Sequence, residues 1–383
     1  MGNVESGAEG QVPWTVVKQT SAQVRSRFVG CLLGGAVGDA LGAPVEFMPL
    51  ATIRSNYGPE GVVDFVPGYA GFGTITDDTQ MTLFTAEGLM RAWVRGRGTL
   101  DEHRMLPTVA LAYLRWLDTQ HESPEYIDTD DRGPLGWLAT HRELWLRRAP
   151  GATCIASLCG MVSPGEPVDN WSKGCGGVMR MAPVGLVGWH LGHRHYPKQT
   201  FDWGVEFAAL THGHPTGQLT AGVLAVLVLA LVDGAPLPEA LAAAKSELCR
   251  HDEHEETLEA IELAEKEAAS GKKPVRSIAR IGEGWVAEEA LAIAIYCALV
   301  AKDFRHGVTL AVNLDGDSDS TGAIAGNLLG AMHGLKAIPR KWLKHLELRD
   351  CIREIATDLH QFPRYLRTYR DTGEGPLAKY PGY

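Results

Sequence analysis

The 383-residue sequence lacks paired cysteines, an excess of basic residues and a long apolar run. Its seven cysteines are odd in number, widely spaced and contain no CxxC pair. They therefore predict reduced, mostly buried thiols rather than a disulfide framework. The formal net charge of −10 argues against a surface that binds nucleic acid.

No segment predicts insertion into a membrane. The most apolar run, residues 221–232, is shorter than the roughly 20 residues that a bilayer-spanning helix needs, and it is typical of a buried helix. The first 24 residues are polar and lack the apolar centre of a signal peptide. We therefore expect a cytoplasmic protein without a membrane partner.

A sustained alternation of apolar and polar residues, the pattern of half-buried strands, is also absent, and no segment of about 20 to 50 residues repeats. Helical periodicity occurs instead, for example over residues 105–120, 135–165, 217–232 and 286–301. Residues 237–270 are rich in glutamate and predict exposed amphipathic helices. The pattern favours an all-α fold of about fifteen or more helices.

The composition divides the chain into three parts. Residues 1–24 have the composition of a flexible N-terminal arm. In the alternative interpretation, the apolar side chain of Trp14 docks onto another surface. Residues 25–370 predict a single domain, and residues 371–383, with their glycines and prolines, predict an irregular tail.

Glycine recurs every four residues along two apolar helical segments. The members of these two ridges are Gly30, Gly34, Gly38 and Gly42, and Gly322, Gly326, Gly330 and Gly334. Each helical glycine costs about 1 kcal/mol relative to alanine, so such ridges are expected where another backbone packs at very short range. We predict two glycine-ridged helices at the centre of the bundle, in contact with each other. Asp39 lies within the first ridge, where a charge is costly unless it is paired or hydrogen-bonded.

Two acidic clusters lie far apart in the sequence, and each precedes a helical pattern. Either cluster alone would be read as a helix cap. Taken together they predict a site for hard divalent cations, which prefer carboxylate, hydroxyl and water oxygens. The expected ligands for one or two Mg²⁺ or Mn²⁺ ions are Thr76, Asp77 and Asp78 from the first cluster and Asp317, Asp319 and Ser320 from the second. Zinc is disfavoured because neither cluster contains His or Cys, and the second cluster lacks the Gly and Glu of an EF-hand loop.

A glycine-rich segment, residues 170–180, provides the third informative pattern. Glycines at 174, 176 and 177 leave backbone N–H groups free to face an anion just before a helical run. An ordinary glycine turn is the alternative. Cys175 is a conceivable nucleophile, but no base partner can be identified from its spacing.

Two further residues remain open between two roles. His212 lies at the boundary before the apolar helix 217–232 and serves either as a cap or as a contact to a phosphate or hydroxyl. Trp285, flanked by glycine, is either a ring platform for a base or sugar or a core residue.

Six motifs, in order along the chain, make residues 27–335 resemble the ADP-ribosylglycohydrolase family. These motifs are GAVGDALG (35–42) with Glu46, TDDTQM (76–81), SKGCGGVMR (172–180), the Thr-His pair at 211–212, GWVAEEAL (284–291) and GDSDSTGAIAG (316–326). The resemblance implies a compact orthogonal bundle of helices with a central binuclear site holding two Mg²⁺ ions, or Mn²⁺. It implies the same six metal ligands, and it places Glu46 on a mobile loop near the scissile ribose.

The resemblance also assigns the substrate-binding residues. The glycine-rich loop and a histidine match positions that hold the diphosphate and distal ribose of ADP-ribose, and we add one acid and one tryptophan to this set. The expected substrate-binding residues are Asp39, Ser172, Gly174, Cys175, Gly176, Gly177, Met179, His212 and Trp285.

The implied activity is metal-dependent hydrolysis of the glycosidic bond at C1 of the proximal ribose in an ADP-ribosylated protein. Bound ions would hold the ribose hydroxyls and orient a water molecule, while carboxylates stabilise oxocarbenium-like charge. Glu46, Asp78 and Asp317 are the candidate catalytic acids, and the sequence does not decide which is the base. ADP-ribosyl-arginine is the expected substrate, whether the modification is regulatory or made by a toxin, and serine-linked ADP-ribose is the alternative.

Two other classes compete with this reading. A non-catalytic protein that binds ADP-ribose or a partner, such as an immunity protein, would be favoured by the loss of a metal ligand, but all six positions bear usable oxygens. A Mg²⁺-dependent phosphohydrolase would be expected to have His-Asp pairs among the ligands, and these are missing. The N-terminal arm is compatible with contact to an ADP-ribosyltransferase toxin.

Overall fold

The computed structural model describes residues 12–69, 71–100, 102–126, 135–372 and 379–381. Over these residues it contains 16 helices and no strand, which confirms the all-α prediction. Extended backbone pairs there only as isolated bridges, between Pro67 and Phe72 and between Gly174 and Val286.

The helices follow one another along the chain as α1 (Ser21–Gly42), α2 (Leu50–Tyr57), α3 (Asp77–Arg95), α4 (Glu102–Thr119), α6 (Ala152–Cys159), α7 (Ala182–His190), α8 (Pro197–Ala209), α9 (Pro215–Asp233), α10 (Leu237–Leu248), α11 (Glu255–Ala269), α12 (Pro274–Ile281), α13 (Ala287–Val300), α14 (Phe304–Ala311), α15 (Ser318–His333), α16 (Arg340–His345) and α17 (Arg349–Thr372). Short 3₁₀ turns are η1 (Leu138–Thr140), η2 (Arg142–Trp145), η3 (Cys175–Gly177), η4 (His193–His195) and η5 (Leu335–Ala337).

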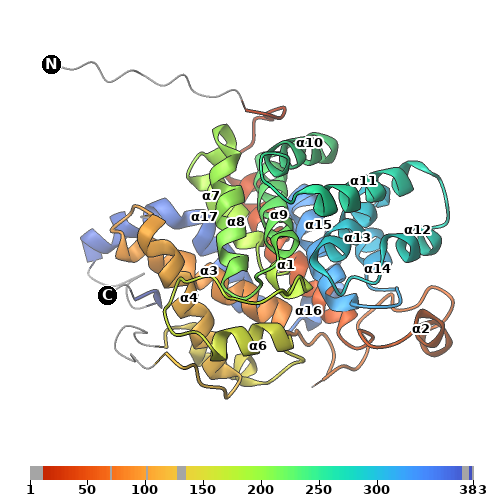
Figure 1. Ribbon diagram of the computed structural model, residues 1–383, viewed down its shortest axis with the longest axis horizontal. Helices are drawn as coiled ribbons and strands as arrows, with labels where there is room; N and C mark the ends of the chain where they lie inside the picture. The colour runs from red at the N-terminus through yellow and green to blue at the C-terminus, as the bar shows by residue number, and fades with distance from the viewer. Residues whose placement is uncertain (1–11, 70, 101, 127–134, 373–378, 382–383) are drawn as a thin grey trace.

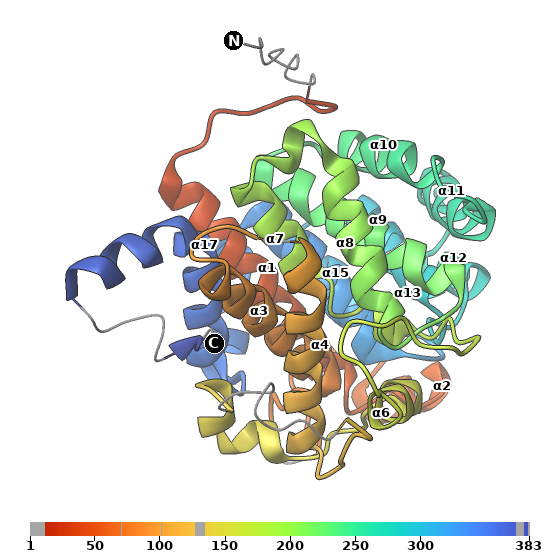
Figure 2. The ribbon, with the colours of Figure 1, turned by 60° about the vertical axis from the view of Figure 1, so that its left-hand side comes forward.

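Helices α1 and α15 form the centre of the bundle and lie side by side in both ribbon views (Figures 1 and 2). A methyl group at Gly38 would lie 1.9 Å from the carbonyl oxygen of Gly322, and one at Gly326 would lie 2.0 Å from that of Gly34. Backbone therefore meets backbone along the two ridges, and any larger residue would force the helices apart. The predicted contact between the glycine-ridged helices is confirmed.

The two central helices are antiparallel, and this brings the acidic segments together. Gly42, at the end of α1, lies against the backbone of Ser318, at the start of α15, whereas Gly30 lies against Gly330 near the other end. Asp39 therefore reaches the same end of the bundle as the second acidic cluster. The N-terminus of α3 joins them there.

The most apolar helix, α9, lies inside the protein among α7, α8, α10 and α13 (Figure 1). By length and composition it is one helix that could cross a membrane, but 89% of its most apolar window is buried against the rest of the protein. Burial of a continuous apolar surface explains its composition, as predicted for residues 221–232.

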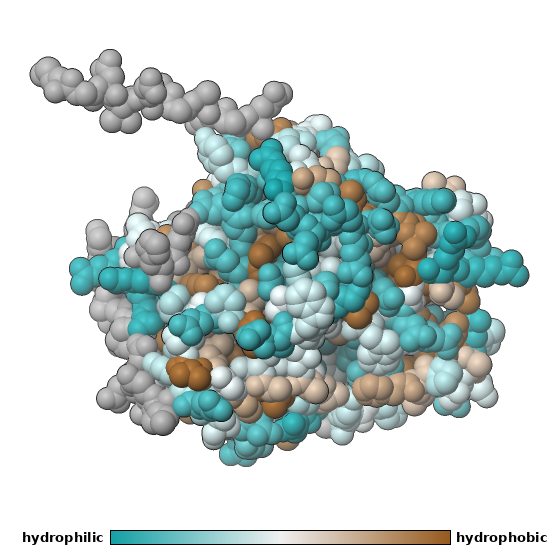
Figure 3. Space-filling view, in the orientation of Figure 1, coloured by the Kyte–Doolittle hydropathy of each residue, from teal (hydrophilic) through white to brown (hydrophobic). Residues whose placement is uncertain are grey.

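The glutamate-rich segment forms α10 and α11 on the outside of the bundle. Figure 3 shows mostly hydrophilic residues over the upper right of this face, where these two helices lie in the orientation of Figure 1. Ile261 and Ala264 of α11 are buried, while Glu259 and Glu262 are exposed, as an amphipathic helix requires.

The described residues near both ends of the chain contact the domain at a few points. Helix α1 begins at Ser21 with a capping box between Thr20 and Gln23. Trp14 is buried and donates from its indole nitrogen to Asp233 at 2.9 Å. Trp14 therefore contacts the domain, as in the docking alternative, while most residues between it and α1 are exposed. Residues 1–11 lie outside the described part, and the N-terminal arm stays a prediction.

In the predicted tail, Tyr380 is also buried. Its hydroxyl donates to Asp358 of α17 at 2.7 Å, and the ammonium group of Lys379 pairs with the same helix. Helix α17 itself ends at Thr372. The predicted boundary at residue 370 is thus close to the end of the last helix, but the described residues beyond it return to the domain.

The helix predicted over residues 135–165 is largely wrong. Most of this segment is loop and 3₁₀ turn, and only α6 is an α-helix. Arg148 is buried and held in place by tertiary contacts, since its guanidinium pairs with Glu347 at 3.0 Å and donates to the carbonyl of Ile75. Such long-range contacts override the local helical propensity.

Candidate active site

Asp39 of α1 anchors the N-terminus of α3. Its carboxylate is fully buried and accepts hydrogen bonds from the backbone and hydroxyl groups of Thr76 and Thr79. The carboxylate thereby satisfies backbone N–H groups at the start of the helix that have no partner within it. Burial and the charge of Asp319 raise the pKa of Asp39 to about 7, while the hydrogen bonds from Thr79 and Thr76 oppose the rise. The substrate-binding role of Asp39 stays a prediction, and its described contacts hold the first turn of α3, which carries Asp77 and Asp78.

Asp77 and Asp78 form the first turn of α3 and are both almost completely buried. Asp77 accepts a hydrogen bond from the backbone of Gly151 at 3.1 Å. Asp78 Oδ1 is buried and has no hydrogen-bond partner among the described residues. Burial, followed for Asp78 by the charges of Asp319 and Asp77, raises the pKa of both carboxyls well above the usual range. A carboxylate in such surroundings calls for a positive group.

The second cluster is the N-terminus of α15. Asp317 is its N-cap and accepts from the backbone N–H of Ser320 at 3.1 Å, and Asp319 accepts from the same group at 3.0 Å. Both carboxyls are buried, and burial raises their pKa. The charge of Asp319 raises the pKa of Asp317 further. The two predicted clusters therefore meet through space, although they are far apart in the chain.

Glu46 joins these acids from the loop that follows α1. Its Oε2 is buried without a hydrogen-bond partner among the described residues. Burial, and then the charges of Asp319, Asp317 and Asp77, raise the pKa of Glu46 to about 10. The protonated form is therefore favoured at neutral pH as long as no cation offsets these charges.

Among the described residues, no three His, Cys, Asp or Glu side chains are arranged so that they could hold a metal ion without moving. The donors are nevertheless all oxygens, and hydroxyl groups from Thr76 and Ser320 accompany the carboxylates. Unpartnered oxygens on Asp78 and Glu46, together with the raised pKa values, are what a cation would relieve. The donor set therefore fits a hard divalent ion better than zinc.

The glycine-rich loop lies beside the acids and is fastened to its neighbours by backbone contacts. Cys175 N donates to the carbonyl of Trp285 at 3.2 Å, Ala287 N donates to that of Lys173 at 2.8 Å, and His214 N donates to that of Ser172 at 3.2 Å. The loop is thereby held between the start of α13 and the start of α9. Its predicted substrate contacts stay predictions, since the structure contains no ligand.

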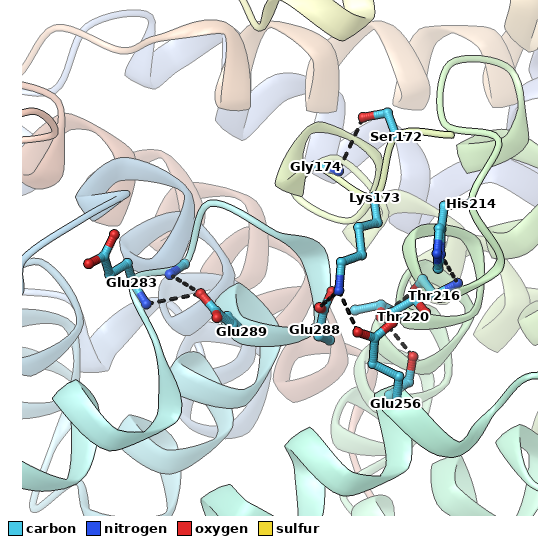
Figure 4. Close-up of polar contacts among 12 residues, drawn as sticks. Ser172, Lys173, Gly174, His214, Thr216, Thr220, Glu256, Glu283, Glu288 and Glu289 are labelled. Atoms are coloured by element: carbon cyan, nitrogen blue, oxygen red, sulfur yellow. Dashed lines mark hydrogen bonds and ion pairs between the residues drawn. The ribbon is translucent and has the colours of Figure 1, made fainter. Parts of the chain in front are cut away.

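Lys173 fixes the outer side of this loop. Figure 4 shows its ammonium group between Glu256 of α11 and Glu288 of α13, with Thr216 donating to the same Glu256. In the same view Glu289 accepts from the backbone of Glu283 and Gly284, which shapes the turn before Trp285. The sequence reasoning did not assign a role to Lys173. Lys173 pairs with glutamates from distant segments, and no local sequence pattern indicates such an ion pair.

The loop and the acidic cluster are joined by Cys175. Its sulfur lies 2.8 Å from Asp317 Oδ2, and the hydroxyl of Ser320 lies 3.5 Å from the same sulfur. Met179 is also buried, and its sulfur lies 3.8 Å from the Ser320 hydroxyl. Burial and the charge of Asp317 raise the pKa of the Cys175 thiol well above its usual range. The nucleophile reading of Cys175 is therefore disfavoured, because a thiol with a raised pKa is a poor source of thiolate.

Trp285 is a surface residue rather than a core residue. It is 38% exposed and stacks on Phe47, with ring centroids 5.6 Å apart and an interplanar angle of 18°. Phe47 is the neighbour of Glu46 and is 70% exposed. The stacked rings border the loop that carries Glu46, and the core-packing alternative for Trp285 is wrong.

His212 lies directly behind the glycine-rich loop. Methyl groups at Gly174 and Gly176 would each lie 3.5 Å from its Nε2 atom, so the imidazole faces the loop closely. Burial, and then the charge of Arg180, lower the pKa of His212 to about 3. Its N-cap alternative does not hold, because the side chain that caps α9 belongs to His214.

A wide cavity on the surface lies away from these acids. It has a volume of about 1100 Å³ and is bordered by residues 16–26, the end of α7 and α17. The acids are covered, with Asp77 at 5% and Asp317 at 3% exposure. The candidate active site is therefore identified by its chemistry rather than by an open cavity.

Comparison with known proteins relates the chain to one family. The family model described as ADP-ribosylglycohydrolase matches residues 20–367. The "ADP-ribosyl-[dinitrogen reductase] glycohydrolase" of Rhodospirillum rubrum is 28% identical over 342 residues, which cover 86% of this chain and 93% of that protein. The "ADP-ribosylarginine hydrolase Tri1" of Pseudomonas putida is 27% identical and covers 89% of this chain, with 79% of its own length matched. A solved "ADP-ribosylglycohydrolase-related protein complex" matches with a TM-score of 0.62 and 28% identity over 89% of this chain and 99% of that one.

Proposed function

Because the chain belongs to the ADP-ribosylglycohydrolase family, we propose that it removes ADP-ribose from the arginine side chains of modified proteins in a metal-dependent reaction. Membership makes the chain a hydrolase of the glycosidic bond to ADP-ribose. The acceptor amino acid and the metal are the parts that we propose. The arginine acceptor is suggested by the name of the Pseudomonas putida relative, which matches most of the chain.

The residues fit a pair of Mg²⁺ ions, with Mn²⁺ as the alternative. Thr76, Asp77 and Asp78 from α3 and Asp317, Asp319 and Ser320 from α15 would hold them. The fit rests on the oxygen-only donor set and on the buried Asp78 oxygen that lacks a partner. When bound, such ions lower the pKa of a water molecule and orient the ribose hydroxyls.

The chain's own residues then have separable tasks in the hydrolysis. Backbone N–H groups of the glycine-rich loop and the imidazole of His212 hold the diphosphate, while the stacked rings of Phe47 and Trp285 border the entrance. Water attacks C1 of the proximal ribose, the C1–N bond breaks, and the guanidine leaves with its electron pair and takes up a proton.

A carboxylate takes the proton that the water gives up, and Asp78, Asp317 and Glu46 are the candidates. Their negative charges also stabilise the oxocarbenium-like character of the ribose as the bond breaks. Glu46 is the candidate on a loop rather than on a helix, and it lies next to the aromatic pair. It therefore has the position from which a proton is most readily exchanged with a leaving group.

One observation carries this proposal: buried carboxylates from α1, α3, α15 and the Glu46 loop converge beside a glycine-rich loop suited to anions. The test is release of ADP-ribose from an arginine-ADP-ribosylated protein, with Mg²⁺ or with EDTA. We expect Mg²⁺-dependent release by the wild type. Asp77→Ala should lose more than the roughly 10- to 100-fold that follows removal of an outer-shell partner of a metal.

Asp252→Ala is the matched control, because Asp252 is exposed on the surface and far from these acids in the sequence. It should retain wild-type release. Activity that is unchanged in EDTA and in Asp77→Ala would overturn the metal-dependent mechanism. Release from serine-linked but not arginine-linked ADP-ribose would overturn the acceptor, and binding of ADP-ribose without any release would favour a binding protein.

A further inference from the structure

Arg180, in the helical turn after the glycine-rich loop, is a fully buried cation without a carboxylate partner among the described residues. Its guanidinium donates to the carbonyl of Phe207 at 3.2 Å and to the hydroxyl of Thr211 at 2.6 Å. It also lies over the ring of Tyr113, 4.3 Å from the centroid. A buried charge of this kind is costly unless it serves the groups around it.

The hydrogen bond to Thr211 determines what the threonine hydroxyl can do. Because Arg180 has only donors, the Thr211 oxygen accepts, and one hydroxyl proton remains to be donated. His212 Nδ1 at 2.8 Å and the carbonyl of Ala208 at 3.4 Å are oxygen or nitrogen acceptors within reach, and the Cys154 sulfur, a weaker acceptor, also contacts the Thr211 side chain. The shorter contact is the stronger one, and the guanidinium polarises the hydroxyl toward donation.

A proton on Nδ1 of His212 would instead point toward an oxygen that already accepts from a guanidinium. The positive charge of Arg180 opposes that arrangement, and it also opposes a charged imidazolium. Burial and this charge lower the pKa of His212 to about 3, so the ring is neutral near pH 7. A neutral imidazole carries one N–H, and the contact to Thr211 assigns it to Nε2.

Nε2 faces the glycine-rich loop at Gly174 and Gly176, whereas Nδ1, which is bonded to Thr211, lies against Gly177. Within the described residues it has no hydrogen-bond partner. An N–H group there is therefore available to an acceptor atom that occupies the loop.

We propose that Arg180 and Thr211 are positioning residues, which hold His212 as the neutral Nε2–H tautomer so that it donates to a phosphate oxygen of ADP-ribose. The phosphate as acceptor rests on the proposed function, whereas the tautomer rests on the contacts alone. The arrangement gives the loop a donor that does not titrate near neutral pH. It also places a buried positive charge behind an anion site that borders several carboxylates.

The tautomer can be measured without substrate. In protein labelled with ¹⁵N-histidine, long-range ¹H–¹⁵N correlation spectra distinguish the two ring nitrogens, and the His212→Gln variant assigns the signal. We expect the Nε2–H tautomer in the wild type. An Nδ1–H tautomer or a protonated ring at pH 7 would overturn the relay, whether or not the protein hydrolyses its substrate.

The role in binding is tested with Thr211→Val, which keeps the shape of the side chain and removes the hydroxyl. We expect the KM for ADP-ribosylated protein and the Kd for ADP-ribose to rise about tenfold, with kcat nearly unchanged and with loss of the pure Nε2–H signature. Thr211→Ser should restore both. Thr220→Val is the matched control, since Thr220 is an equally buried threonine of α9 whose hydroxyl bonds to Thr216 and Thr257.

An unchanged Kd in a folded Thr211→Val protein would overturn the positioning role. If Thr211→Val does not fold, the Kd and the spectrum of Thr211→Ala take its place, with Thr211→Ser as the control that keeps the hydroxyl. A wild-type protein that shows the Nε2–H tautomer but does not bind ADP-ribose would overturn the phosphate contact and the proposed function together. The two failures are thus distinguishable.

Discussion

The sulfur of Cys175 lies 2.8 Å from Oδ2 of Asp317, so the glycine-rich loop and the acidic N-terminus of α15 are in direct contact. Burial and the charge of Asp317 raise the pKa of the thiol, which keeps its proton and donates it to the carboxylate. The contact joins the segment that suits an anion with the segment that suits a cation. The two halves of the candidate active site are therefore one structural unit.

We predict that Cys175 resists alkylation. After iodoacetamide treatment of the native protein at pH 8, peptide mass mapping should find the exposed Cys249 modified and Cys175 intact, because thiolate is the reactive species. Hydrolase activity should survive. Rapid modification of Cys175 accompanied by loss of activity would contradict this and would restore the nucleophile reading.

We predict that Asp78→Asn stabilises the protein while it abolishes activity. The change removes one charge from a group of buried carboxylates that raise one another's pKa, and it should increase the free energy of unfolding in EDTA by about 1–3 kcal/mol. Thermal unfolding in EDTA and in Mg²⁺ checks this, and Mg²⁺ should raise the Tm of the wild type more than that of the variant. The control Asp252→Asn, at an exposed position, should alter neither quantity. A lower Tm of Asp78→Asn in EDTA would be evidence against mutual repulsion.

We predict that Gly38→Ala severely destabilises the fold. The added methyl group would lie 1.9 Å from the carbonyl oxygen of Gly322, so α1 and α15 would have to separate, at a cost of about 3 kcal/mol or more. Urea unfolding should show this as a lower midpoint. Gly160→Ala is the control, because the added methyl group would lie 3.5 Å from its nearest neighbour, the carbonyl oxygen of Ala156. This substitution should change the free energy of unfolding by about 0.5 kcal/mol or less. Equal effects of the two substitutions would refute the close approach.

We predict that His193 makes the protein sensitive to acid. It is buried against Trp203 and bonded to Thr200, and burial lowers its pKa to about 4 from 6.5. Between pH 4 and pH 6.5 the unfolded chain therefore binds more protons at this histidine than the folded protein does. The contribution of neutral His193 to the free energy of unfolding is complete above pH 6.5 and is lost as the pH falls toward 4. At pH 5 the loss from this one group reaches about 2 kcal/mol.

Urea unfolding of His193→Gln at pH 7 and pH 5 checks this prediction. The difference in free energy of unfolding between the two pH values should shrink relative to the wild type. His345→Gln, at an exposed position, serves as the control and should keep the wild-type difference. An undiminished difference in His193→Gln would show that other groups cause the acid sensitivity.

Much of the central fold was predictable from the spacing of residues. A glycine every fourth residue places the small side chains on one face of a helix, and only a close partner compensates for their cost. The two acidic clusters were also readable from local sequence, because Thr76 and Asp317 are the N-caps of α3 and α15. Local chemistry therefore indicated both the central pair of helices and the donor atoms.

Other features were beyond the reach of local patterns. The segment around Arg148 is held by an ion pair with Glu347, and Lys173 is held by Glu256 and Glu288, so neither geometry follows from neighbouring residues. The residues that flank Trp285 in the sequence do not indicate whether its side chain is buried or exposed. Its stacking on Phe47 depends on the path of two separate loops.

The sequence by itself determined the helical class, the oxygen donors and the glycine ridges, since each depends on residue type and on periodicities of a few residues. The tertiary structure decided that the ends of α1, α3 and α15 meet, that the Cys175 thiol faces Asp317, and that Arg180 and Thr211 stand behind His212. These relations join residues that lie on different segments of the chain. Burial, charge and hydrogen-bond direction act through space, and only the folded protein brings those groups within range of one another.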